Sequence, residues 1–205
     1  EFRAANAAIV APPADGAVPA DSETLRSYPL YPYLQAARLQ RRLEDPAAAP
    51  AIEAFLAEHG DAPVARSLRR SWLMSLAQRK AWEPYLAAYR EDVDDSAAAR
   101  CNWLAARVAT GRTDGLADQV TATYLTGKSL PAACDPAFDW LRAQGWLAPA
   151  LIERRARLAL AAGEAGLARF LARSLPESQA GPINQWAVLI EQPRTAIESL
   201  TANPD

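Results

Sequence analysis

The side chains best suited to chemistry in this 205-residue chain are its two cysteines and its single histidine. Cys101 lies in "ARCNWLAARV", and Cys134 follows 33 positions later in "LPAACDPAFDWL". A catalytic Cys–His pair would need His59 and a third group that orients the imidazole, and the sequence indicates no such group. The residues alone leave three states open for the cysteines: two free thiols, one reactive nucleophile, or the two ends of a disulfide.

Three further polar features predict structural roles. His59 in "AEHGD" is expected at the C-terminal end of a helix, where an imidazole is favourable. Two cysteines and one histidine match no zinc spacing, so we predict no metal site. "TGKS" at 126–129 lacks the glycine that a phosphate-binding loop needs at the required offset, and it follows a predicted helix. We interpret it as a helix stop followed by a polar loop, and we predict no cofactor.

The large aromatic and basic side chains predict packing and a solvated surface. Arg69 and Arg70, and then Arg154, Arg155 and Arg157, form local basic patches, which we interpret as solvated helix faces with ion pairs between helices. Tryptophans recur along the predicted helices and are expected to fill the spaces between them. They are Trp72, Trp82, Trp103, Trp140, Trp146 and Trp186.

Helical periodicity runs through most of the chain, and no alternating β-branched run competes with it, so the predicted class is all-α. Residues 1–27 mix Ala, Pro and Asp and indicate a leading arm with one short helix. Proline near helix starts and glycine after helix ends set most boundaries. The predicted helices cover about 32–43, 52–59, 63–76, 82–90, 97–110, 115–126, 136–144, 149–162, 166–175, 181–190 and 194–201.

Short connections predict how these helices are arranged. Loops such as "RK" at 79–80, "GRTDG" at 111–115 and "GEAG" at 163–166 make consecutive helices antiparallel neighbours. A series of such hairpins predicts a superhelical α-solenoid. The hairpin spacing is irregular, so the solenoid is tetratricopeptide-like without a strict repeat of about 34 residues. An irregular helical domain is the alternative.

Composition limits the partners. The formal net charge of −2 gives no basic footprint, so nucleic acid is not expected as a partner. No apolar run approaches the roughly 20 residues that span a bilayer, so no membrane span is expected. No cleavable signal peptide is visible, and a mature secreted protein would look the same.

Several segments, read in order, resemble the N-terminal part of the soluble lytic murein transglycosylases, which are large periplasmic enzymes. The resemblance runs from about residue 20 to the end. It is carried by "YPLYPYL" at 28–34, "CNWLAARVATG" at 101–111, "YLTGKS" at 124–129, "ACD" at 133–135 and "LIERRARLALAAG" at 151–163, together with the cysteine spacing.

The resemblance implies a fragment of a larger enzyme. The family cleaves the β-1,4 bond between N-acetylmuramic acid and N-acetylglucosamine and leaves a 1,6-anhydromuramic end, with one Glu of a C-terminal lysozyme-like domain as acid and then base. Glu198-Ser199 superficially matches the Glu-Ser pair of that domain, but the glycine-rich sequence that follows the pair is missing. We therefore expect the lysozyme-like domain to be absent, and no catalytic residue is predicted.

The resemblance also implies a role, a compartment and partners. Residues 28–205 would form the first portion of a U-shaped superhelical domain that holds the murein (peptidoglycan) glycan strand near the catalytic domain. The remaining superhelix and the catalytic domain would be partners, and the chain is expected to be a monomer. A periplasmic location favours a disulfide between Cys101 and Cys134. The alternative function is a free-standing periplasmic adaptor that binds a peptide or protein on a concave face.

Overall fold

The computed structural model describes residues 1–11, 20–60 and 62–194. In these ranges the chain forms twelve α-helices, two 3₁₀ helices and no β-strand, which confirms the all-α prediction. The chain divides into two compact units, Glu1–Ala99 and Arg100–Asp205, called unit 1 and unit 2 here. Helix α7 (Ala97–Ala109) begins in unit 1 and continues in unit 2.

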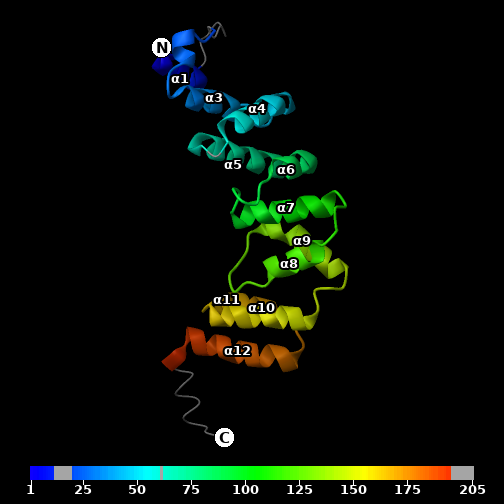
Figure 1. Cartoon of the computed structure of the whole chain (residues 1–205). Helices are drawn as coiled ribbons and strands as arrows, with labels where there is room; N and C mark the ends of the chain where they lie inside the picture. The colour runs from blue at the N-terminus through cyan, green and yellow to red at the C-terminus, as the bar shows by residue number, and fades with distance from the viewer. Residues whose placement is uncertain (12–19, 61, 195–205) are drawn as a thin grey trace. The chain divides into compact units, whose positions relative to one another are not determined.

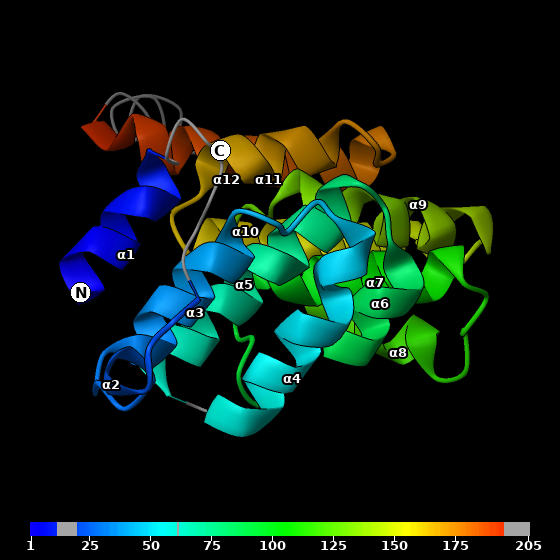
Figure 2. The ribbon, with the colours of Figure 1, turned by 90° about the horizontal axis from the view of Figure 1, so that it is seen from above.

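Unit 1 is built from helices that pack on the next helix of the chain or on the one after it (Figure 1). The longest, α5, packs against α3, α4 and α6, and α1 lies next to α3 in both views of the ribbon (Figures 1 and 2). The helices are α1 (Phe2–Val10), α2 (Glu23–Arg26), α3 (Tyr31–Gln40), α4 (Ala49–His59), α5 (Pro63–Gln78) and α6 (Trp82–Ala88), with a 3₁₀ turn η1 at Pro46–Ala48.

The spacing of apolar residues explains why α5 occupies this position. Leu68, Trp72 and Leu76 recur every fourth residue and therefore lie on one side of the helix, where all three are buried. Pro63 is the first residue of α5, where its missing N–H leaves no hydrogen bond unmade. Gly60 ends the preceding helix with φ of +52°, a conformation that glycine adopts without strain.

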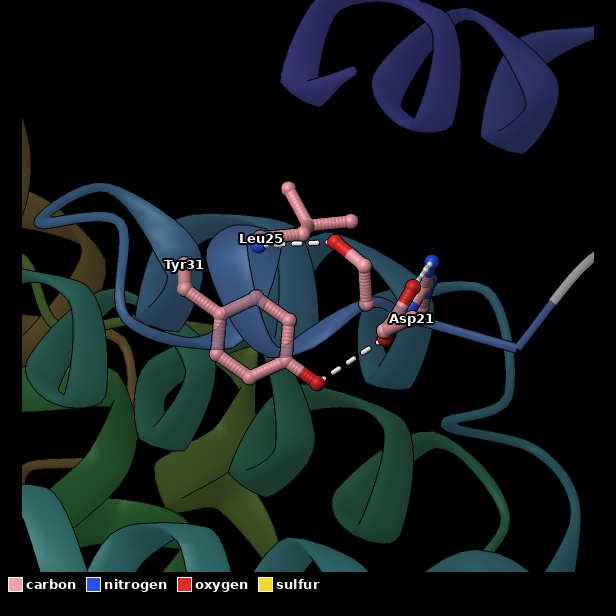
Figure 3. Close-up of polar contacts among 5 residues, drawn as sticks. Asp21, Leu25 and Tyr31 are labelled. Carbon is pink, nitrogen blue, oxygen red and sulfur yellow. Dashed lines mark hydrogen bonds and ion pairs between the residues drawn. The ribbon is translucent and has the colours of Figure 1, made fainter.

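A polar cluster ties the leading arm to α3 (Figure 3). The Asp21 carboxylate accepts hydrogen bonds from the Tyr31 hydroxyl at 2.9 Å and from Arg38 Nη2 at 2.8 Å. Ser22 caps α2, because its Oγ accepts the Leu25 backbone N–H at 3.1 Å. The hydrogen bond from Arg38, outweighing the opposing effect of burial, holds the pKa of Asp21 at about 2. The arm is therefore attached to α3 by an ionised carboxylate.

Unit 2 contains most of α7 and five further α-helices, of which α10, α11 and α12 pack on one another in sequence (Figure 1). Its buried core runs from Cys101 to Ala187 and includes residues of every helix in the unit. The helices after α7 are α8 (Leu116–Tyr124), α9 (Asp135–Ala143), α10 (Pro149–Ala161), α11 (Ala165–Ala172) and α12 (Glu177–Glu191), with a 3₁₀ turn η2 at Ala132–Cys134.

Three predicted boundaries need correction or fall outside the described residues. Helix α12 begins at Glu177 and not at 181 as predicted. Proline is typical of the first turn of a helix, but Pro182 lies inside this one. The leading arm contains two helices, α1 and α2, instead of one. Helix α1 buries none of its residues, although Phe2, Ala5 and Ile9 recur at helical spacing. Most of the helix predicted at 194–201 lies outside the described ranges.

Candidate binding groove in unit 2

Helices α8 to α11 of unit 2 enclose a groove of about 670 Å³. Tyr124 and Phe138 form one wall, with their rings edge to face at a centroid separation of 5.0 Å. Leu167 and Phe170 of α11 form another wall, and the Phe170 side chain is 62% exposed. The groove thus combines aromatic and aliphatic surface with an opening to solvent, which is the usual composition of a ligand site.

Arg155 of α10 lines this groove and is its only strongly buried charge among the described lining residues, at 6% exposure. Its guanidinium carbon lies 4.4 Å from the centroid of the Tyr124 ring and 5.6 Å from that of Phe138, which are cation–π distances. Its Nε donates to no acceptor, and no described carboxylate forms an ion pair with it. The prediction that Arg155 belongs to a solvated face is therefore wrong.

The interior of the groove also changes the pKa of Tyr124. Burial raises the pKa of its phenol, and the positive charge of Arg155 opposes part of that rise. The phenol is accordingly neutral at physiological pH and serves as an aromatic wall and a hydroxyl group. It supplies no negative charge to compensate Arg155.

The first turn of α11 adds backbone donors to the same groove. Gly166 and Leu167 line it, and the residue before the helix, Glu164, makes no side-chain cap. The first N–H groups of a helix have no partner within the helix and carry its positive dipole end. A Cβ built on Gly166 meets no atom within 4 Å, so space is open beside this turn.

Exposed acidic side chains stand at the rim. Asp135 and Asp139 of α9 both line the groove, and Asp139 pairs with Arg142 at 2.6 Å. Both partners of this pair are about two-thirds exposed, so water screens them and the pair contributes little to stability. The rim is acidic and solvated, whereas the buried charge of the groove is positive.

The disulfide lies in the core of unit 2. The structure joins Cys101 of α7 to Cys134 of η2, with the two Cα atoms 4.5 Å apart and both residues fully buried. Neither cysteine is free, so the structure contains no thiol nucleophile at these positions. Because η2 leads directly into α9, the bridge fixes the start of the helix that carries Phe138.

Gly127 in "TGKS" has a packing role that the sequence did not reveal. Helix α8 ends at Tyr124, three residues before this glycine. A Cβ on Gly127 would overlap the backbone carbonyl of Leu158 and would lie 3.0 Å from the Cβ of Ala162. The loop therefore passes directly against α10, and only glycine allows that approach.

The remaining site predictions have mixed outcomes. His59 lies in the last turn of α4, as expected, with its ring 4.3 Å from that of Phe55. Its Nε2 has no hydrogen-bond partner. In the described ranges no cluster of three or more His, Cys, Asp or Glu residues is placed to hold a metal ion. Glu198-Ser199 lies outside those ranges.

The tryptophans do not all pack in the core. Trp72 is buried, and Trp103 and Trp140 pack against the core of unit 2. Trp146 and Trp186 are more than half exposed, so the prediction is wrong for these two. A tryptophan in a helix or a loop carries no sequence signal for which neighbour covers it.

One more arginine departs from the solvated-face prediction. Arg69 of α5 is 7% exposed, and its Nη1 donates a 3.0 Å hydrogen bond to the Ala88 carbonyl. Arg70 and Arg154 are exposed, as predicted. Arg157 pairs with Glu153 at 2.7 Å, so this ion pair lies within α10 and not between helices as predicted.

Comparison with known proteins identifies homologues along most of the chain. It is 36% identical over 152 residues to the soluble lytic murein transglycosylase of Salmonella typhimurium, covering 74% of this chain and 23% of that protein. The Escherichia coli K12 enzyme of the same name is 32% identical over 173 residues, covering 84% and 26%. The chain thus spans about a quarter of the length of the curated relatives it matches. No protein-family model matches it.

Solved structures give the same result. The 70-kDa soluble lytic transglycosylase of Escherichia coli superposes on 84% of this chain with a TM-score of 0.71 and 32% identity, covering 28% of that chain. An inactive mutant of lytic transglycosylase Slt from Pseudomonas aeruginosa superposes on 98% with a TM-score of 0.75 and 25% identity, covering 37% of that chain. These matches agree with the predicted α-solenoid class. No described helix has the length and apolar character that crossing a bilayer requires.

Proposed function

Since the chain is homologous to about a quarter of the length of the soluble lytic murein transglycosylases, we propose that it is the N-terminal superhelical portion of such an enzyme. The parent enzyme would cleave the bond between N-acetylmuramic acid and N-acetylglucosamine and leave a 1,6-anhydromuramic end. The carboxyl group that performs this reaction would belong to a different part of the parent. The function of this portion is architectural, namely to position the glycan strand and the catalytic domain.

The main support for this proposal is that the relatives align with most of this chain, whereas this chain aligns with only a small part of each relative. The solved transglycosylases match 84% to 98% of this chain, whereas the chain matches only 28% to 37% of theirs. A segment that aligns almost completely with part of a larger enzyme is most simply explained as the same part. The buried Cys101–Cys134 bridge supports a periplasmic location, since disulfides persist in oxidising compartments.

The absence of catalysis is tested with purified murein sacculi. The 205-residue chain should release no 1,6-anhydromuropeptides, while the full-length Escherichia coli enzyme releases them under the same conditions. Chromatography with mass detection measures the products. Release of anhydro products by the chain alone would overturn the proposal.

The architectural role is tested with a chimera. We expect the Escherichia coli enzyme to retain activity on sacculi when this chain replaces its aligned segment, because the two share 32% identity and superpose with a TM-score of 0.71. Deletion of the same segment should reduce that activity. A chimera that is folded but as inactive as the deletion would contradict the proposal and favour the free-standing adaptor.

A further inference from the structure

We propose that the groove of unit 2 binds a carboxylate of a short peptide, recognised by Arg155 and by the first-turn N–H groups of α11. Murein carries short peptides with free carboxylates, so this inference deepens the proposed function and rests on it for the choice of murein as the source. The groove would lie in the non-catalytic portion of the parent enzyme. This portion would then bind the short peptides of murein.

The unmatched charge of Arg155 is the first argument. A buried charge is costly unless a partner compensates it, and no described carboxylate pairs with this guanidinium. The rings of Tyr124 and Phe138 lie at cation–π distances and the neutral Tyr124 hydroxyl interacts with the guanidinium, and these groups compensate the charge only in part. A guanidinium that lines a groove can bind the two oxygens of a carboxylate at once.

The start of α11 is the second and independent argument. Its uncapped N–H groups lie at the positive end of the helix, and anions bind at such ends. Gly166 and Leu167 of this turn line the same groove as Arg155. Two separate elements, α10 and the start of α11, thus line the same groove.

The walls and the rim indicate a peptide carboxylate rather than a phosphate. Leu167, Phe170 and Ile152 give an apolar surface that would contact a side chain next to the carboxylate. The acidic rim, Asp135 and Asp139, would repel a dianion more than a monoanion, although Arg142 neutralises part of that charge. Peptides that also carry an ammonium group would be attracted to the same rim.

Calorimetric titration of the 205-residue chain tests the proposal. One probe is a murein disaccharide–peptide with free carboxylates, and its comparators are the same compound with the carboxylates amidated and the disaccharide without a peptide. Acetyl-Ala-Ala with a free carboxylate tests the same chemistry without sugar. We expect both probes with free carboxylates to bind, and the amidated compound to bind at least tenfold more weakly. Inorganic phosphate at equal concentration should not compete with either probe.

Matched variants assign the effect to the groove. Arg155→Met keeps most of the side-chain volume and should weaken binding of the disaccharide–peptide about tenfold or more, whereas Arg154→Met on the exposed side of α10 should leave it unchanged. Gly166→Leu adds bulk where no atom lies within 4 Å of the new Cβ, so it should block the groove without disturbing the core. Circular dichroism of each variant establishes that it is folded.

The results that would overturn the inference are distinct from those that bear on the proposed function. Equal binding of the amidated probe, phosphate competition, or equal affinities of the Arg155 and Arg154 variants would refute the carboxylate site. Binding of acetyl-Ala-Ala but not of the disaccharide–peptide would refute murein as the source. The chimera experiment does not depend on Arg155. An active chimera without peptide binding would therefore refute the carboxylate site and leave the proposed architectural function intact.

Discussion

At the scale of single residues, the burial of a side chain and the effect of substituting it depend on the atoms within a few ångströms. Arg154 and Arg155 are adjacent in sequence, yet one is exposed and the other is buried against two aromatic rings. Helical periodicity accounts for this difference, because Arg155 lies three residues after Ile152 and four before Ala159, on the buried side of α10, whereas Arg154 lies outside that side. The importance of Gly127, in contrast, comes from the Leu158 carbonyl on another element, which no local pattern reveals.

Gly127→Ala should destabilise the chain by about 1–3 kcal/mol, because its Cβ would overlap the α10 backbone and force the loop away. Urea denaturation measures the change. Gly166→Ala is the matched control: its Cβ meets nothing within 4 Å, so stability should be unchanged or slightly higher. Equal effects of the two substitutions would show that the loop does not pack closely on α10.

Asp21 should make unit 1 less stable in acid. Its pKa in the folded chain is about 2, below the ordinary 3.8, so its contribution to stability is fully present above pH 3.8 and is lost as the pH falls through 2. Asp21→Asn should therefore cost roughly 1–2 kcal/mol at pH 7 and much less near pH 2. Urea unfolding at both pH values measures the difference.

The control for Asp21 is Asp139→Asn, which removes a pair whose side chains are both about two-thirds exposed. Exposed pairs contribute little, so its cost should stay below about 1 kcal/mol at pH 7. An Asp21→Asn cost that is the same at pH 7 and at pH 2 would contradict the ionised cluster with Arg38.

At the scale of the elements, the helices with a continuous apolar stripe were predictable from sequence. Helices α5 and α10 match their predicted ranges closely, since proline marks each start and the fading of periodicity or a glycine marks each end. Helix α4 ends where predicted but begins at Ala49, three residues before the predicted start at Ile52. The start of α12 was misplaced because Pro182 is tolerated inside it. The groove was not predictable, because its walls come from four helices whose mutual packing no local pattern encodes.

The disulfide connects two elements, and its removal should be measurable as a loss of stability. Reduction, or the double substitution Cys101→Ala and Cys134→Ala, should lower the free energy of unfolding by roughly 3–4 kcal/mol, the value expected for a closed loop of this length. Urea denaturation of the oxidised and reduced chains gives the number. Thiol titration of the denatured, unreduced chain should find no reactive thiol, and finding two would contradict the bridge.

At the scale of the whole molecule, the chain consists of two compact units. The core cluster of buried residues that contains the disulfide lies entirely between Cys101 and Ala187, within unit 2. A unit that has its own core can fold on its own. The groove and the bridge therefore both belong to unit 2.

A fragment from Ala97 to Asp205, which keeps the whole of α7, should fold alone. We expect helical circular dichroism, one cooperative urea transition and the same absence of reactive thiols as in the full chain. A fragment from Leu116 lacks Cys101 and is the control, for which a weak or broad transition is expected. A broad, non-cooperative transition in the longer fragment would contradict an independent unit 2.

The Cys101–Cys134 bridge also has a consequence for timing. A newly made chain in a reducing cytosol would carry two thiols at these core positions, and it would lack the stability that the bridge supplies. If the mature protein works outside the cytosol, as proposed, unit 2 would cross the membrane in its weaker form, which is easier to keep unfolded for transport. Formation of the disulfide after transport would then stabilise the folded form of unit 2.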